Sequence, residues 1–122
     1  MTAEAAIYSF FSSFGITAYA ETSVPEDVTY PFLTYTGSRS PWNGAGAGIT
    51  VNLWYYTESE KIPNDKANEI YDVLKHGGVS LPCDDGVVWL VAGDPFCQSL
   101  VDDADRNIKR RYINITRYDL RE

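Results

Sequence analysis

The stretch ITVNLWYY at positions 49–56 decides the fold, because its apolar side chains recur at every second position. In an extended chain the odd-numbered residues of this stretch share one face and can bury it against a core. A central β-strand is therefore predicted here. The other face carries Trp54 and Tyr56 in place of charges, so we expect a helix or a second subunit to cover it as well.

Similar patterns on both sides of this strand predict the other elements of a single α+β domain spanning residues 1–122. Alternation, or enrichment in β-branched and aromatic residues, predicts further strands at 16–20, 32–36, 79–83, 87–92 and 108–118. The turn Asp84-Asp85-Gly86 predicts that the strands at 79–83 and 87–92 form a hairpin. Apolar residues at three- and four-residue spacing predict a helix at 2–14, and a second helix that Asn64 caps and Gly77-Gly78 ends. We expect a mixed, mostly antiparallel sheet of about five strands with two helices packed on it.

Two segments between these elements are expected to be loops. Residues 37–48 have no periodicity and many small residues, which predicts a flexible loop. Trp42 within this loop is costly to leave in water, so we expect it to contact another surface. Residues 93–105 are expected to form a second loop before the last strand.

Charge and targeting signals exclude several classes of protein. Ten basic and seventeen acidic residues give a net charge of −7, which is the wrong sign for wrapping nucleic acid. The start of the chain lacks a basic signal-peptide region, and no apolar run reaches the length of a membrane span. We expect a protein that is made and kept in the cytosol, with Cys83 and Cys97 reduced.

The basic residues gather near the end of the chain, and alternation in the last predicted strand decides which of them act together. One face of this strand would carry Lys109, Arg111, Ile113, Ile115 and Arg117. We expect the two isoleucines to point into the core and the two arginines to lie at its rim. Arg110 falls on the other face, where we expect it to serve association with an acidic neighbour, such as the loop that carries Asp102, Asp103 and Asp105.

An acidic cluster in this region resembles a calcium-binding loop in part. Asp103, Asp105 and Asn107 occupy the first three ligand positions of such a loop. Ile108 stands where the loop needs glycine, and Asn114 stands where it needs its final glutamate. We therefore predict no metal site.

No other set of residues predicts a catalytic or cofactor-binding site. His76 lies beside the predicted helix end, where a cation next to the negative end of the helix dipole is ordinary. Cys97 has no cationic neighbour in the sequence to lower its thiol pKa, so we expect a buried structural thiol. We expect that the chain is not an enzyme and binds no cofactor.

The order of the segments and several short motifs resemble the tail terminator proteins of long-tailed bacteriophages and prophages, which are also called minor capsid or head-tail joining proteins. The resemblance runs from Ile7 to Tyr118 and is carried by YPFLTY at 30–35, VNLWYYT at 51–57, Gly77-Gly78, LPCDDG at 81–86 and DPFCQ at 94–98.

This resemblance implies a structural virion protein that assembles as a hexameric ring, caps the tail tube and joins it to the head. Its partners would be further copies of itself, the tail tube protein and the head-closure protein, and DNA would pass through the ring without specific binding. The protein would belong to the neck of the virion and would assemble in the host cytoplasm. A head-closure or adaptor role in the same neck is an alternative, and a small ligand-binding module or enzyme is a more distant one.

Aromatic residues are abundant in this chain, and they are enriched in subunit interfaces as well as in cores. We expect the interface to include a set of aromatic and charged residues, namely Arg39, Trp42, Trp54, Tyr56, Asp103, Asp105 and Arg110.

Overall fold

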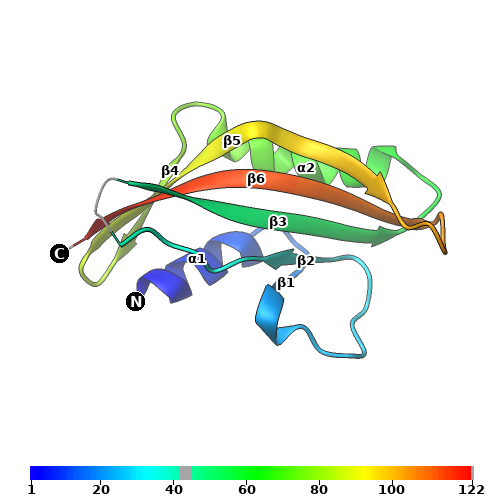
Figure 1. Cartoon of the computed structure of the whole chain (residues 1–122), viewed down its shortest axis with the longest axis horizontal. Coiled ribbons are helices and arrows are strands. Elements are labelled where there is room, and N and C mark those ends of the chain that lie inside the picture. Colours follow the sequence, from blue (N-terminus) through cyan, green and yellow to red (C-terminus); the bar gives the residue numbers. More distant parts are fainter. Residues whose placement is uncertain (42–44, 122) are drawn as a thin grey trace.

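The computed structural model describes residues 1–41 and 45–121 and has the predicted α+β architecture (Figure 1). Two α-helices, a short 3-10 helix and six strands follow one another along the chain. Their bounds are α1 (Ala3–Ser12), β1 (Thr17–Ala20), η1 (Glu21–Ser23), β2 (Phe32–Tyr35), β3 (Gly46–Tyr56), α2 (Lys61–Leu74), β4 (Val79–Cys83), β5 (Gly86–Val101) and β6 (Ile108–Arg121). None of the helices in the described part of the chain is both long enough and apolar enough to cross a membrane.

The six strands form one sheet in the order β1-β2-β3-β6-β5-β4, which is one strand more than the predicted number of about five. Only the β1–β2 pair is parallel, so the sheet is mixed and mostly antiparallel, as predicted. The predicted central strand lies in the middle as β3, between β2 and β6. The sheet curls into a half-barrel around the helices.

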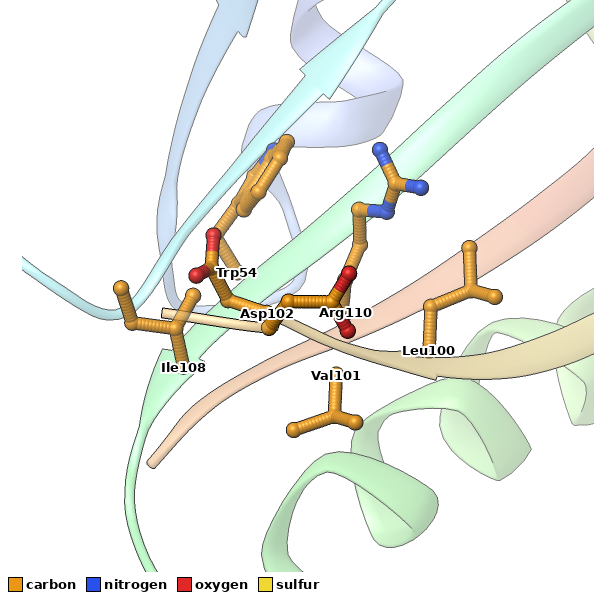
Figure 2. A pocket seen from close by; sticks show the side chains of 7 residues that line it. Trp54, Leu100, Val101, Asp102, Ile108 and Arg110 are labelled. Carbon is orange, nitrogen blue, oxygen red and sulfur yellow. The ribbon is translucent and has the colours of Figure 1, made fainter. Parts of the chain in front are cut away.

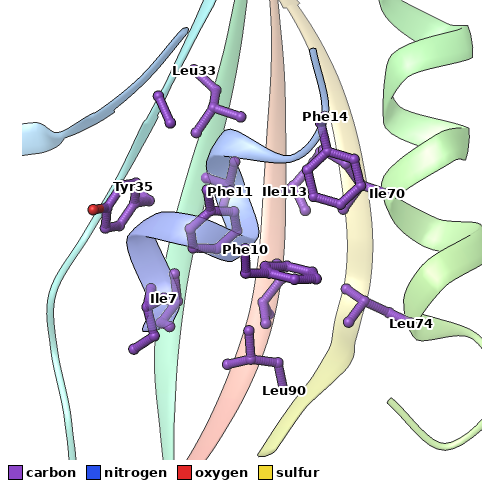
Figure 3. Packing of buried hydrophobic residues seen from close by; sticks show 14 of the residues in the cluster. Ile7, Phe10, Phe11, Phe14, Leu33, Tyr35, Ile70, Leu74, Leu90 and Ile113 are labelled. Atoms are coloured by element: carbon purple, nitrogen blue, oxygen red, sulfur yellow. The ribbon is translucent and has the colours of Figure 1, made fainter. Parts of the chain in front are cut away.

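Both helices pack on the same face of this sheet. The register places Val51 of β3 opposite Ile113 of β6, and both side chains are fully buried. Phe11 of α1 and Ile70 of α2 are also fully buried and belong to the same cluster (Figure 3). Burying each of these large apolar side chains contributes about 2–3 kcal/mol to folding. The core therefore occupies one side of the sheet and leaves the other side without a covering helix.

Helix α1 forms where its capping residues predict it. Thr2 Oγ1 accepts a hydrogen bond from the Ala5 backbone N–H at 3.1 Å, which satisfies one of the free donors at the helix start. Gly15 has φ +82°, a conformation that favours glycine, and it turns the chain into β1. The helix ends at Ser12, slightly before the predicted end at Phe14.

Helix α2 begins earlier than predicted, and Asn64 is not its cap. The helix starts at Lys61, and Ser59 Oγ accepts from the Ile62 backbone N–H at 3.2 Å. Pro63 lies in the first turn, where its missing N–H is not needed. Asn64 Oδ1 instead accepts a hydrogen bond from Arg111 of β6 at 2.9 Å.

The predicted loop at 37–48 is partly wrong, because β3 already begins at Gly46. Gly46, Ala47 and Gly48 pair with the second half of β6. A Cβ on Gly46 would lie 2.9 Å from a methyl group of Thr116, so glycine at this position permits close strand packing and does not mark a flexible loop. Trp42 lies outside the described residues.

The predicted loop at 93–105 is also largely wrong. The hairpin of β4 and β5 forms as predicted, but β5 continues to Val101. The pairing register with β6 shifts between Ala92 and Cys97, so the residues between them bulge out of the ladder. Asn114 Nδ2 fixes this bulge by donating to the Pro95 carbonyl oxygen at 2.8 Å. The true connection to β6 therefore comprises only residues 102–107.

Candidate functional site

The sheet has one face that neither helix covers, and we call it the open face. On β3 and β6 it is formed by the residues that alternate with the core positions. Apart from two glycines of β3, its members on these two strands are Thr50, Asn52, Trp54, Tyr56, Ile108, Arg110, Tyr112, Asn114, Thr116, Tyr118 and Leu120. We expected a helix or a second subunit over Trp54 and Tyr56, and the positions of α1 and α2 remove the first of these alternatives.

Aromatic rings gather at one end of the open face. The Phe32 and Trp54 rings stack with centroids 6.0 Å apart and an interplanar angle of 12°. Tyr30 joins them, with its ring centroid 5.3 Å from that of Phe32 and 5.9 Å from that of Tyr56. Trp54 Nε1 donates to Thr34 Oγ1 at 3.2 Å, which fixes the indole in place. Tyr56 stays 55% exposed, so this aromatic cluster reaches solvent.

Arg110 extends the aromatic cluster onto β6. Its guanidinium carbon lies 5.3 Å from the centroid of the Trp54 ring, a cation–π geometry. Figure 2 shows Trp54 and Arg110 on neighbouring strands, pointing to the same side of the sheet. The alternation predicted for the last strand is confirmed here, because Arg110 faces away from the core.

A pocket of about 250 Å³ lies between Arg110 and residues 102–107, the acidic connection that follows β5 (Figure 2). It is lined by Trp54, Leu100, Val101, Asp102, Asp103, Ile108 and Arg110. Among the described residues no ion pair joins Arg110 to Asp102 or Asp103. The pocket therefore presents an aromatic ring and charges of both signs to solvent at one end of the open face.

Two of the three aspartates in this connection build the turn. Asp102 Oδ1 accepts from the backbone N–H groups of Ala104 at 2.8 Å and Asp105 at 3.1 Å. Asp105 Oδ1 accepts from the Asn107 backbone N–H at 3.0 Å. These are the local hydrogen bonds through which aspartate favours turns. Asp102 and Asp103 are both exposed, but the carboxylate of Asp103 is not used in these turn hydrogen bonds, so Asp103 is the aspartate best placed to meet a partner.

The expected interface residues do not all come together. Trp54, Tyr56, Asp103 and Arg110 lie at the same end of the open face, and Asp105 belongs to the adjoining turn. Arg39 lies elsewhere, because its guanidinium is 3.7 Å from the Glu4 carboxylate of α1. Trp42, as noted, is outside the described residues. The sequence did not single out Tyr30 and Phe32, because membership of the cluster depends on the register of β2 with β3.

The prediction that Arg111 and Arg117 lie at the rim of the core is wrong. Arg111 is 1% exposed, and its guanidinium contacts the Glu60 carboxylate at 2.6 Å and Asn64 Oδ1 at 2.9 Å. Arg117 is 2% exposed and pairs with Asp119 at 3.0 Å. Buried charges persist only when they are paired and hydrogen-bonded, and both arginines meet this condition. Both arginines make their contacts within the subunit and are not available to a partner.

Cys97 is half-buried next to the core, not fully buried as the sequence suggested. Burial raises the pKa of its thiol, and the nearby charge of Arg111 opposes this effect in part. A raised pKa leaves less thiolate at neutral pH, so this thiol is a poor nucleophile.

Comparison with protein-family models, with curated proteins and with solved structures gives no match to this chain. The function proposed next therefore depends on the open face itself and on the resemblance carried by the sequence motifs.

Proposed function

We propose that this chain is a structural subunit of the neck of a long-tailed bacteriophage, a tail terminator that forms a ring on the finished tail tube and joins it to the head. The motifs at 51–57, 81–86 and 94–98 support this proposal through their resemblance to tail terminators. The chain acts by binding other proteins, and DNA passes through the ring. The negative net charge suits such a passage, because it disfavours contacts with phosphates.

The observation that carries the proposal is the aromatic cluster on the open face. Stacked aromatic rings with an adjacent arginine are the residues that dominate the centres of protein interfaces. In this chain they lie on a sheet face that neither helix covers, and Tyr56 leaves more than half of its side chain in water. Covering this cluster with a protein surface would remove apolar area from water, which favours association.

In the proposed assembly, the open face contacts the tail tube protein, and the head-closure protein binds the other side of the ring. Arg110 and Asp103 lie beside the aromatic cluster and would form its charged rim. Charges at a rim chiefly set the rate and the salt dependence of association. The ring would assemble in the host cytoplasm and remain in the virion.

The experiment is sedimentation of the purified chain with tail tubes that were assembled without a terminator. We expect the wild-type chain to sediment with the tubes and Tyr56→Ser to bind at least tenfold more weakly. Tyr8→Ser is the matched control, because Tyr8 is similarly exposed (50% against 55%) but lies on α1. Equal loss of binding in both variants, or no binding by the wild type, would contradict the proposal. Binding to tail-less heads but not to tubes would assign the chain to the head-closure role instead.

A further inference from the structure

The sheet has two outer borders that carry unpaired backbone groups. Strand β4 pairs only with the first part of β5, from Gly86 to Leu90. The later part, Cys97–Val101, pairs with β6 on one side, and no strand in the described chain lies on its other side. In Figure 1 this part of β5 borders the sheet on the side of α2. At the opposite border, β1 pairs with β2 alone.

These two borders lack two features that commonly protect an edge strand, namely proline and charged side chains. Natural proteins protect such edges with proline, charged side chains or covering segments, because free N–H and C=O groups invite pairing with another chain. Strand β4 contains Pro82, which cannot donate to a further strand. Cys97–Val101 reads CQSLV and β1 reads TAYA, so neither contains a proline or a charge. Both edges are therefore able to accept another strand.

A groove runs beside the free edge of β5 and gives an added strand room. It has a volume of about 570 Å³ and is lined by Asn64, Ala67, Asn68, Tyr71, Phe96, Cys97 and Ser99. The Tyr71 and Phe96 rings pack edge to face, with centroids 5.1 Å apart, and both contribute to its lining. None of the lining side chains is charged, although charged residues make up 22% of the chain. Such a groove suits an uncharged extended segment with small side chains.

We propose that the Cys97–Val101 edge of one copy receives strand β1 of a second copy, so that the sheet continues from subunit to subunit. This inference rests on the proposed ring, and it names the contact that closes the ring. Strand β1 has four residues against the five of the edge and carries no charge, and its partly buried Ala20 has a side chain small enough for the groove. The two edges lie on different surfaces of the subunit. A contact of this kind repeats head to tail and closes into a ring when the rotation permits.

Side-chain alternation predicts which residues meet across this contact. Cys97 and Ser99 lie on the helix-covered face of β5, because their partners in β6 are Ile113 and Arg111. Ala18 and Ala20 lie on the same face of β1, since they pair with the core residues of β2. Thr17 and Tyr19 lie on the open face, where the Tyr19 ring contacts that of Phe32. In a continuous sheet, Ala20 of one copy therefore shares a face with Cys97 of the next.

Disulfide cross-linking tests this arrangement in the full chain. The background variant Cys83→Ser leaves Cys97 as the native thiol, and Ala20→Cys adds a second thiol on β1. Within one chain β2, β3 and β6 separate β1 from β5. At about 4.8 Å per strand the two positions are far beyond the reach of an intramolecular disulfide. Under oxidation in the presence of tail tubes, we expect a ladder of covalent oligomers that ends at the closed ring.

Two matched variants define the face and the register. Thr17→Cys in the same background places the thiol on the opposite face of β1, and we expect at most a tenth of the cross-linking found with Ala20→Cys. The second variant combines Cys97→Ser with Ser99→Cys and keeps Ala20→Cys. It moves the thiol on β5 by two residues on the same face, so it cross-links if β1 pairs two residues further along the edge.

The outcomes separate this inference from the proposed function. A ring seen by light scattering that cross-links in neither register overturns the strand pairing and leaves the ring standing. Equal cross-linking with Thr17→Cys, or covalent dimers through Cys97 alone, also overturns the pairing. If no oligomer forms with or without tubes, both proposals fall.

Discussion

The buried contact between Arg111 and Glu60 gives a stability prediction with a distinctive asymmetry. The Arg111 guanidinium is 1% exposed and donates to Glu60 Oε2 at 2.6 Å, to Asn64 Oδ1 at 2.9 Å and to the Arg110 carbonyl oxygen at 3.2 Å. Glu60→Ala removes the anionic acceptor and leaves a buried cation with neutral partners only. Lys109, whose ammonium is 3.7 Å from the same carboxylate, loses its counter-charge as well.

The magnitude follows from the exposure of the two partners. A hydrogen bond to a charged group contributes about 1.5–3 kcal/mol, and breaking a fully buried pair costs about 3–5 kcal/mol. The Glu60 side chain is 61% exposed, so water can enter the vacated position and screen part of this loss. We therefore expect Glu60→Ala to lower the free energy of unfolding by about 2 kcal/mol.

Arg111→Met should cost less than Glu60→Ala, because it removes the buried charge itself and leaves Glu60 solvated. We expect Arg111→Met to lower the free energy of unfolding by about 1 kcal/mol or less. Urea unfolding of both single variants and the double variant measures the coupling free energy, which we expect to be about 1–2 kcal/mol. A coupling of about zero, or a larger loss in Arg111→Met than in Glu60→Ala, would refute the reasoning.

Three other predictions concern packing, reactivity and assembly. Gly46→Ala should lower the free energy of unfolding, measured in urea, by about 1 kcal/mol or more, because the new Cβ would lie 2.9 Å from a side chain of β6. Gly48→Ala is the control and should be close to neutral, because Gly48 has open space around it. In the Cys83→Ser background, the alkylation rate of Cys97 should rise at a higher pH than the alkylation rate of an ordinary free thiol, because burial raises the pKa of the Cys97 thiol and only the thiolate reacts. A rate with the same pH dependence as that of a free thiol would contradict this. Arg110→Glu should weaken binding to tail tubes at low salt in sedimentation measurements while changing stability by about 0.5 kcal/mol or less; unchanged binding would remove the role of this rim charge.

Much of the fold follows from local sequence patterns. Alternation in 49–56 and in the last strand predicted β3 and β6, including the burial of Ile113 and Ile115. The turn at Asp84-Asp85-Gly86 predicted the β4–β5 hairpin. In these segments the backbone preference and the pattern of burial point to the same structure, so a short stretch of sequence is informative.

The predictions that failed concern interactions between distant segments. Residues 93–105 read as a loop, yet Asn114 on β6 holds the Pro95 carbonyl group in a bulge and β5 continues beyond it. Gly46 reads as part of a flexible loop until Thr116 is known to lie opposite. Arg111 was expected at the rim of the core, because the sequence does not show that Glu60 and Asn64 contact it from the region where α2 begins.

The candidate site was predicted only in part, for the same reason. Trp54, Tyr56 and Arg110 could be placed on outward positions from alternation alone. Tyr30 and Phe32 join them through the pairing of β2 with β3. The free edge of β5 had no signal in the sequence, because the bulge that extends β5 past β4 was not foreseen.

The central claim is that copies of this chain close into a ring on a tail tube, and the number of subunits tests it most directly. Multi-angle light scattering of the free chain, and of the complex released from tail tubes, measures the mass in multiples of the subunit mass of 13.7 kDa. The account predicts a single closed species, a hexamer, in the complex recovered from the tubes. A chain that stays monomeric at high concentration and also in the presence of tail tubes would contradict it.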